Sequence, residues 1–185
     1  MIRTFIAVEI PETVKNEIAD FQNALRKEHF SIRWVRPENL HLTLKFIGDI
    51  PESLVEDIKT GVFERGSLYS PFEVSLKGTG VFPTIKRPKV FWAGITQGRD
   101  ELSTLAEKTE NALVKFGIEK DRRPFKPHLT IGRIKDPRET SGIVRHISVD
   151  FFTGIPFTVD RMIFMRSILK PSGAEYSPLA VQEFK

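Results

Sequence analysis

The chain has 185 residues, of which 40% are apolar, so it can bury a core in one large domain or in two small lobes. It has no cysteine, which excludes disulfide bonds, cysteine-ligated zinc and a thiolate nucleophile. The net charge of +4 favours an anionic partner such as nucleic acid. No apolar run approaches the ~18 residues of a membrane span, and acidic residues come too early for a signal peptide, so we expect a cytoplasmic protein.

In the first half of the chain, alternating apolar residues predict strands, and a 3.6-residue apolar period that begins near a proline predicts helices. In chain order, the predicted elements are a strand over 2–10, a helix over 11–29, strands over 32–35 and 40–47, and a helix over 51–65. A turn is predicted at 36–39, where Pro37 and Asn39 favour it.

The second half of the chain is predicted by the same signals. In chain order, the predicted elements are strands over 72–76 and 89–96, a helix between Asp100 and Gly117, a strand over 128–134, a weaker helix over 138–146, and strands over 151–159, 162–169 and 176–183. Segment 77–88, which includes Gly78 and Gly80, is predicted to be a turn because Pro83 and the lack of a following helix exclude a phosphate loop.

The order of these elements predicts the fold class. Strands outnumber helices and are often separated by short turns, so we expect an α+β fold with mainly antiparallel sheets. The two halves run in a similar order, which makes an internal duplication plausible. No linker divides the chain, so we expect residues 1–185 to form a single domain with two lobes.

One short pattern occurs in both halves: His41-Leu42-Thr43-Leu44 and His128-Leu129-Thr130-Ile131. Side chains two residues apart on a strand project from the same face, so each copy places an imidazole beside a hydroxyl. Two histidines that face one cleft can act as complementary acid and base, while the hydroxyls donate hydrogen bonds to phosphoryl oxygens. This set of groups predicts phosphodiester cleavage.

Further basic residues are candidates for contact with the same ligand. Lys45 shares the His41 face by strict alternation, whereas Arg133 falls on the face opposite His128 unless a bulge reorients it. The basic loops 86–89 and 122–126 are candidates for following a nucleic-acid backbone, with Phe125 or Trp92 as a stacking surface.

A metal site is the competing interpretation of the paired histidines. The two motifs supply only two imidazoles, and no acidic residue lies two or four positions after either histidine, so we expect no metal and no cofactor. His29 and His146 are interpreted as solvated or capping residues. A module that binds nucleotides or nucleic-acid ends without turnover stays an open alternative.

The paired His-x-Thr-x motifs, with Gly48 after the first and Pro127 before the second, resemble those of the two-histidine phosphoesterase superfamily. Over its whole length the chain is similar to the RNA 2′,3′-cyclic phosphodiesterases, also called 2′-5′ RNA ligases. The similar segments are residues 3–8, 34–35, 80–83, 90–94 and 173–176.

This resemblance implies a bilobal fold in which the motif strands lie at the centre of a cleft, related by a pseudo-twofold axis. It implies metal-independent hydrolysis of a terminal 2′,3′-cyclic phosphate of RNA to a 2′-phosphate, and a reverse capacity to form 2′-5′ linkages in tRNA halves. Carried over to this sequence, His41 is the proton donor to the leaving 3′-oxygen and His128 is the proton acceptor from water. Thr43 and Thr130 then hold the phosphoryl oxygens.

A related enzyme that acts on small nucleotides, such as ADP-ribose 1″,2″-cyclic phosphate, would use the same four residues and stays an alternative. The expected partners are therefore RNA ends that carry a cyclic phosphate, including tRNA halves. We expect a monomer that does not bind membranes.

Overall fold

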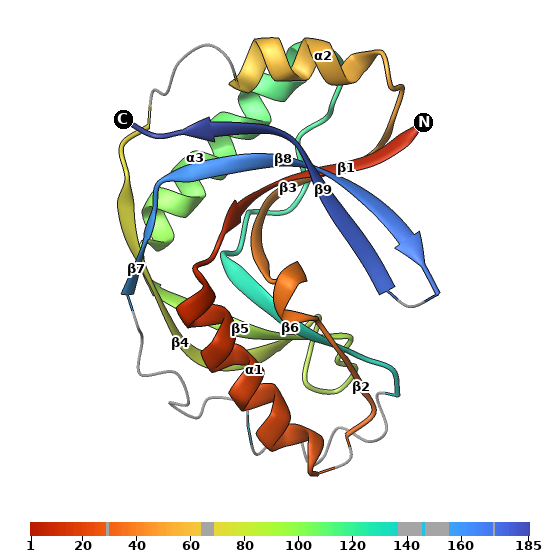
Figure 1. Cartoon of the computed structure of the whole chain (residues 1–185), viewed down its shortest axis with the longest axis vertical. Helices are drawn as coiled ribbons and strands as arrows, with labels where there is room; N and C mark the ends of the chain where they lie inside the picture. The colour runs from red at the N-terminus through yellow and green to blue at the C-terminus, as the bar shows by residue number, and fades with distance from the viewer. Residues whose placement is uncertain (29, 64–68, 137–145, 147–155, 172) are drawn as a thin grey trace.

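The computed structural model describes residues 1–185 except 29, 64–68, 137–145, 147–155 and 172, and it shows two sheets with helices beside them (Figure 1). The strands are β1 (Ile2–Glu9), β2 (Ile32–Trp34), β3 (His41–Ile50), β4 (Phe72–Phe82), β5 (Val90–Gln97), β6 (His128–Ile134), β7 (Pro156–Val159), β8 (Arg161–Lys170) and β9 (Gly173–Glu183). The helices are α1 (Glu12–Arg26), α2 (Leu54–Ile58), which continues as a π-helix over Lys59–Phe63, and α3 (Arg99–Leu113), with 3-10 turns at Pro37–Asn39 and Val114–Phe116.

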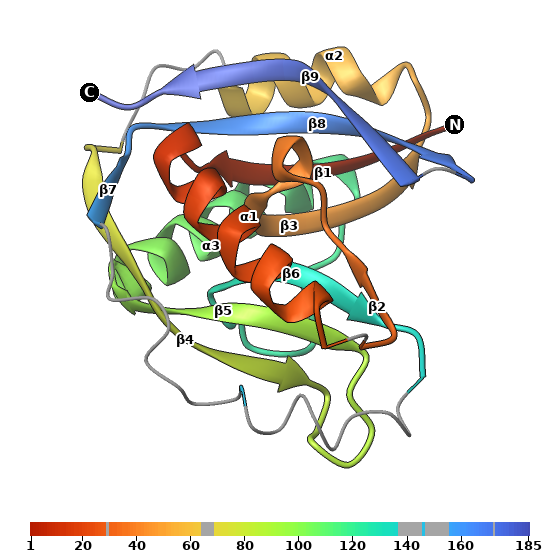
Figure 2. The same ribbon diagram turned by 60° about the horizontal axis from the view of Figure 1, so that its bottom comes forward.

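The two sheets share one strand order. Sheet A has the order β3-β1-β8-β9 and sheet B has the order β2-β6-β5-β4-β7, and all neighbouring strands are antiparallel. The first order corresponds to β6-β5-β4-β7 in the second, with β2 added beside β6 (Figure 2). The predicted α+β fold with antiparallel sheets is confirmed, and the two sheets are related as an internal duplication predicts.

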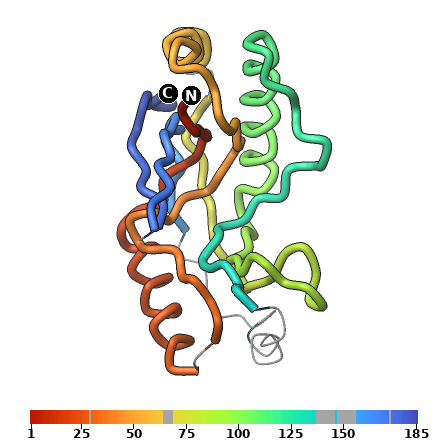
Figure 3. The backbone as a smooth tube through the Cα atoms, turned by 90° about the vertical axis from the view of Figure 1, so that its right-hand side faces the viewer, coloured from red at the N-terminus to blue at the C-terminus, as the bar shows by residue number. Residues whose placement is uncertain are grey.

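Each long helix packs on the sheet that does not contain the strand before it. α1 follows β1 of sheet A, but the Gln22 amide donates to the Ile131 carbonyl of β6 in sheet B at 2.8 Å. α3 follows β5 of sheet B, but Glu110 forms an ion pair with Lys45 of β3 in sheet A at 2.6 Å. Figure 3 shows the two helices on opposite sides of the molecule. Apolar residues from both sheets and both helices join in one core.

The apolar period of α1 decides how this helix packs. Its buried apolar residues recur every three or four positions, so they form one stripe that faces the core, and the rest of the helix surface is mostly solvent-exposed. The stripe consists of Val14, Ile18, Phe21 and Leu25. The buried Gln22 lies beside this stripe and reaches the backbone of β6, so α1 also fixes the position of a motif strand.

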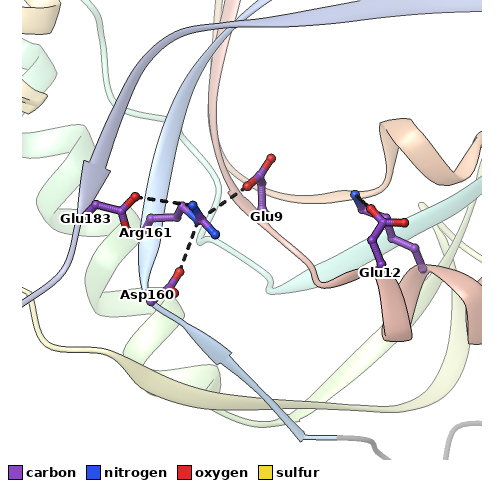
Figure 4. A network of polar contacts seen from close by, with 6 residues as sticks. Glu9, Glu12, Asp160, Arg161 and Glu183 are labelled. Atoms are coloured by element: carbon purple, nitrogen blue, oxygen red, sulfur yellow. Dashed lines mark hydrogen bonds and ion pairs between the residues drawn. The ribbon is translucent and has the colours of Figure 1, made fainter.

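Arg161 joins the ends of three neighbouring strands of sheet A (Figure 4). Its guanidinium lies 3.6 Å from Glu9 at the end of β1, 3.4 Å from Asp160 and 3.5 Å from Glu183 at the end of β9. These groups are partly exposed, so each pair contributes little to the free energy of unfolding. They connect the ends of β1, β8 and β9, and β1 is the strand that pairs with β3.

The largest difference from the predicted elements concerns β4, which continues from Phe72 to Phe82 where a turn was predicted from residue 77. Gly80 pairs with Trp92 of β5, and a Cβ at Gly80 would lie only 2.2 Å from the Trp92 ring. Gly80 therefore permits the Trp92 indole to approach the backbone of β4 closely. The glycine lies within a strand, although the composition of segment 77–88 had suggested a turn.

Other boundaries differ by less. β3 runs on to Ile50. The second helix begins at Leu54, three residues later than predicted, and continues as a π-helix to Phe63, and the last two predicted residues lie outside the described part of the chain. The predicted helix over 138–146 and the first part of the strand predicted over 151–159 lie outside the described residues, apart from residue 146. Within the described part of the chain, no helix has the length and apolar character needed to cross a membrane.

Candidate active site

The two motif strands, β3 and β6, contact each other where sheet A meets sheet B. In β3, His41 lies opposite Glu9 and Thr43 lies opposite Ala7 of β1. In β6, His128 lies opposite Gly94 and Thr130 lies opposite Trp92 of β5. The two histidine–threonine pairs therefore occupy matching positions in two sheets of matching strand order.

Both imidazoles are held in the same way. Nδ1 of His41 lies 2.7 Å from the Asn39 carbonyl oxygen, and Nδ1 of His128 lies 2.7 Å from the Lys126 carbonyl oxygen. A carbonyl oxygen can only accept a hydrogen bond, so Nδ1 carries the proton in the neutral ring. Each histidine thus keeps Nε2 as the atom that can accept or donate a proton.

Aromatic rings pack against both imidazoles. The His41 ring stacks on Phe5 with centroids 4.8 Å apart, and Tyr176 meets it edge-on at 5.2 Å. The His128 ring meets Phe82 edge-on at 5.0 Å. Trp92 of β5 also lies beside the His128 ring. The four aromatic residues come from four strands, and their packing restricts the orientation of both imidazole rings. Sequence reasoning missed them as a group because strand pairing alone brings them together.

The same surroundings change the proton affinity of both histidines. Burial lowers the pKa of His41 to about 4; the hydrogen bond to the Asn39 carbonyl opposes this effect, and the positive charge of Arg133 adds to it. Burial and Arg133 also lower the pKa of His128, against the effect of the Lys126 carbonyl. Both imidazoles are therefore neutral at pH 7, and an anion bound beside them would raise both pKa values.

A β-bulge after Thr43 determines where the next side chains of β3 point. Thr43 and Lys45 face consecutive residues of β1, so Leu44 is the extra residue. The Lys45 side chain is only 2% exposed, and its ammonium lies 2.6 Å from Glu110 and 2.8 Å from Asp121. The structure therefore does not bring Lys45 to the site, because the strict alternation that predicted a phosphate contact does not hold across the bulge.

A matching bulge in β6 has the opposite consequence for Arg133. Thr130 and Gly132 face consecutive residues of β5, so Ile131 is the extra residue. Arg133 is turned to the face of Thr130, and both residues line the same cavity. The sequence had left this orientation open, and the bulge makes Arg133 a candidate phosphate contact.

The cavity has a volume of about 390 Å³, and it contains three of the four motif residues, His41, Thr43 and Thr130. His128 does not line it but precedes Thr130 on the same strand. Among the described residues, five basic side chains and no acidic side chain line the cavity: Arg3, Arg33, Arg36, Arg133 and Lys170. Such a lining suits a polyanionic ligand.

Other candidates from the sequence lie elsewhere. None of the cavity-lining residues comes from the basic loops 86–89 and 122–126. Nε2 of His146 lies 3.0 Å from a carboxylate oxygen of Glu28, which is within ion-pair distance. In the part of the chain that the structure describes, no group of three or more His, Cys, Asp and Glu side chains is placed to hold a metal ion.

Two imidazoles and two hydroxyls thus lie on matching strands at a basic cavity, an arrangement suited to acid–base cleavage of a phosphodiester. The chain matches the family described as LigT-like phosphoesterase over residues 8–92 and 94–176, and it belongs to that family.

Known relatives cover the chain almost completely. It is 33% identical to the RNA 2′,3′-cyclic phosphodiesterase of Methanothermobacter thermautotrophicus over 97% of both chains. It is 34% identical to the enzyme of that name from Thermotoga maritima, over 100% of this chain and 96% of the relative. Its fold is similar to the crystal structure of TT0787 of Thermus thermophilus, with a TM-score of 0.84, 30% identity and coverage of 98% and 97%.

Proposed function

We propose that this chain is a metal-independent RNA 2′,3′-cyclic phosphodiesterase, which opens a terminal cyclic phosphate and leaves a 2′-phosphate. The observation that carries the proposal is the matched pair of imidazoles, each fixed through Nδ1 and each followed by a threonine on the same strand. The names of the relatives that match the whole chain support the same reaction.

In the proposed reaction, Nε2 of His128 accepts a proton from water while the water oxygen forms a bond to phosphorus. The bond between phosphorus and the 3′-oxygen breaks, and protonated His41 gives its Nε2 proton to that oxygen. The hydroxyls of Thr43 and Thr130 donate to the non-bridging oxygens, where charge accumulates. Afterwards His41 is neutral and His128 is protonated, and exchange with solvent restores the starting state.

Burial suits His128 to the role of base, whereas His41 becomes the acid only when a bound ligand raises its pKa. A neutral His128 is ready to accept a proton at pH 7, since its pKa is lowered. The acid must be charged, although burial holds the pKa of His41 at about 4 without a ligand. A cyclic phosphate carries one negative charge, and its arrival raises this pKa. Substrate binding therefore prepares the acid.

The first experiment follows an oligonucleotide with a terminal 2′,3′-cyclic phosphate and identifies the product as the 2′- or 3′-phosphate. His41→Ala and His128→Ala should each lower kcat by roughly 10²–10⁴, whereas His146→Ala, a histidine outside the cavity, should not. The double variant should lose less than the product of the two single effects. A chelator should leave the rate unchanged. Loss of activity with EDTA and its return with zinc or manganese would overturn the proposal.

A second substrate tests which histidine is the acid. Replacement of the 3′-bridging oxygen by sulfur gives a leaving group that needs no proton, so the rate should recover in His41→Ala but not in His128→Ala. Recovery in His128→Ala instead would exchange the two roles. Binding of the cyclic phosphate without turnover would support a binding module.

Finer parts of the proposal need their own measurements. Ligation of tRNA halves through a 2′-5′ linkage would use a 5′-hydroxyl in place of water: His128 accepts its proton, the 5′-oxygen bonds to phosphorus, and the bond to the 3′-oxygen breaks with a proton from His41. Relative rates on RNA and on ADP-ribose 1″,2″-cyclic phosphate decide between an RNA enzyme and one for small nucleotides.

We also propose that residues 1–185 form one domain that acts as a cytoplasmic monomer. Sedimentation would test the oligomeric state.

A further inference from the structure

Arg33 lies directly opposite Arg133 in the β2–β6 strand pair. Residues in such a cross-strand pair share one face of the sheet, with Cβ atoms about 5 Å apart. The neighbouring pair, Ile32 and Ile134, is buried on the other face, so the two arginines point toward the cavity, which both of them line. Like charges in this arrangement repel each other and destabilise the sheet.

Nothing in the described part of the chain neutralises this pair. Neither Arg33 nor Arg133 forms an ion pair with a described residue, and no carboxylate is among the described residues that line the cavity. By contrast, two other basic residues of the lining have acidic neighbours: Lys170 lies 2.6 Å from Glu175, and Arg36 lies 3.9 Å from Glu38. Two opposed, unpaired guanidinium groups are an arrangement that a bound anion would stabilise.

The side chain of Arg33 also reaches across the cavity. A Cβ built at Gly173, the first residue of β9 in sheet A, would lie 3.5 Å from Nη2 of Arg33. The guanidinium therefore extends from sheet B toward sheet A, where Lys170 of β8 and Gly173 of β9 line the cavity. Its planar group has five N–H donors, which suits the oxygens of a phosphate.

The spacing along β6 separates this position from the reacting phosphate. Thr130 and Arg133 are three residues apart, which corresponds to about 7–10 Å along a strand, and Arg33 lies on the next strand. In an RNA end, the charge nearest to the terminal cyclic phosphate is the phosphodiester on the 5′ side of the same nucleoside, one ribose away. The separation of Arg33 from Thr130 is thus of the same order as the separation between these two phosphates.

We propose that Arg33, with Arg133, forms an upstream phosphate site that binds the phosphodiester 5′ to the terminal nucleoside and makes the enzyme prefer RNA ends over nucleoside cyclic phosphates. The inference rests on the proposed function because it takes the cyclic phosphate to be bound at the motif threonines. Arg33 is the residue that determines specificity, and Arg133 lies between the two phosphates.

The test compares two dinucleotides that both end in a 2′,3′-cyclic phosphate and both carry a 2′-O-methyl group on the first nucleoside. One has a normal phosphodiester between the nucleosides, and the other has an uncharged methylphosphonate. Their ratio of kcat/KM isolates the upstream charge, because base, ribose and reacting group are the same. We expect a ratio of about 10 or more for the unmodified enzyme, as for a lost hydrogen bond to a charged group.

Three variants locate the effect. Arg33→Gln should bring the ratio close to 1, and Arg33→Lys, which keeps the charge but not the planar fork, should give a value between. Arg26→Gln makes the same change of net charge at an exposed position of α1 outside the cavity, and it should keep the original ratio. Circular dichroism and thermal unfolding show whether each variant is folded.

The contrary results are distinct. A ratio near 1 in the unmodified enzyme, an unchanged ratio in Arg33→Gln, or an equal fall in Arg26→Gln would overturn the upstream phosphate site. If no cyclic phosphate is hydrolysed at all, the proposed function fails. The site is then tested with the same pair of dinucleotides ending in a 2′-phosphate, whose Kd values need no turnover. Equal Kd values for that pair would overturn the site independently.

Discussion

Asn39 is bound to His41 through its backbone and to β9 through its side chain. Its carbonyl oxygen lies 2.7 Å from Nδ1 of His41, and its amide donates to the Ala174 carbonyl at 2.8 Å. Ala174 lies two residues before Tyr176, whose ring packs on the same imidazole. One asparagine thus joins the turn before the motif to the strand that covers His41.

We predict that Asn39→Ala weakens this connection without removing the hydrogen bond to the imidazole, which uses the backbone. The free energy of unfolding should fall by about 1 kcal/mol, the usual contribution of one hydrogen bond. The turnover number should fall more than KM changes, because the contacts of Asn39 with His41 and Ala174 position the imidazole, although Asn39 also lines the cavity. Denaturant titration and steady-state kinetics measure both effects. Asn23→Ala, at an exposed position of α1, is the matched control, and an equal loss there would contradict the prediction.

The lowered histidine pKa values predict an acidic optimum for kcat/KM. The active form needs one charged and one neutral imidazole, so the pH profile is a bell centred between two apparent pKa values. Both histidines have a pKa below 6.5 in the free protein, and that of His41 is about 4, so the centre should lie below pH 6.5. Activity should fall above that centre as the acid loses its proton, and below it as the base gains one. The measurement is kcat/KM from about pH 4 to 9.

Two comparisons sharpen the pH prediction. The bell for kcat should lie at higher pH than the bell for kcat/KM, because the bound phosphate raises both pKa values. Arg133→Gln removes a positive charge that lowers them, so its kcat/KM bell should also move to higher pH. Arg26→Gln should leave the bell in place. A flat profile, or a bell centred above pH 7, would argue against the paired histidines.

The motif threonines are predicted to bind phosphate through their hydroxyls. Thr43→Val and Thr130→Val keep the branched shape that strands favour but remove the donor. Affinity for phosphate-bearing ligands should fall by about 1–3 kcal/mol in each variant. Titration with a nucleoside 2′-phosphate measures the change, and Thr96→Val, at an exposed position of β5 outside the cavity, is the control. Unchanged affinity in both motif variants would limit these residues to strand formation.

Lys45 is predicted to stabilise the fold, not to bind substrate. Lys45→Met removes the partner of Glu110 and Asp121 and leaves the Glu110 carboxylate, which is 19% exposed, without its cation. Loss of one partner of a buried pair costs about 3 kcal/mol. Lys59→Met breaks an exposed pair with Glu56 on one helix turn and should cost less than about 0.5 kcal/mol. Similar losses of unfolding free energy in the two variants would show that the buried pair stabilises the fold no more than the exposed pair does.

The sequence was sufficient to predict the fold class and the two motif strands. Alternation identified β3 and β6 within a few residues because each has one face on the core, and a cluster of apolar residues identified β1, which is buried on both faces. The repeated His-x-Thr pattern was enough to select the four candidate residues, since two side chains at spacing two need only an extended backbone. These predictions depend on local geometry alone.

What could not be predicted depends on pairing between distant strands. Strict alternation placed Lys45 with His41 and left Arg133 on the other face, and a single extra residue in each strand reverses both outcomes. Bulges leave no clear signature in one sequence. The opposition of Arg33 and Arg133 likewise requires the register of β2 on β6, which neither strand encodes by itself.

The exchange of helices between the sheets limits how the molecule can move. The space between β3 and β6 cannot widen by a hinge motion unless α1 leaves the backbone of β6 or α3 loses its ion pair with β3. The width of the cleft is therefore set during folding, before any ligand arrives. Catalytic geometry and global stability are then lost together: on heating, activity should persist up to the unfolding transition and disappear with it, with no earlier inactive but folded state.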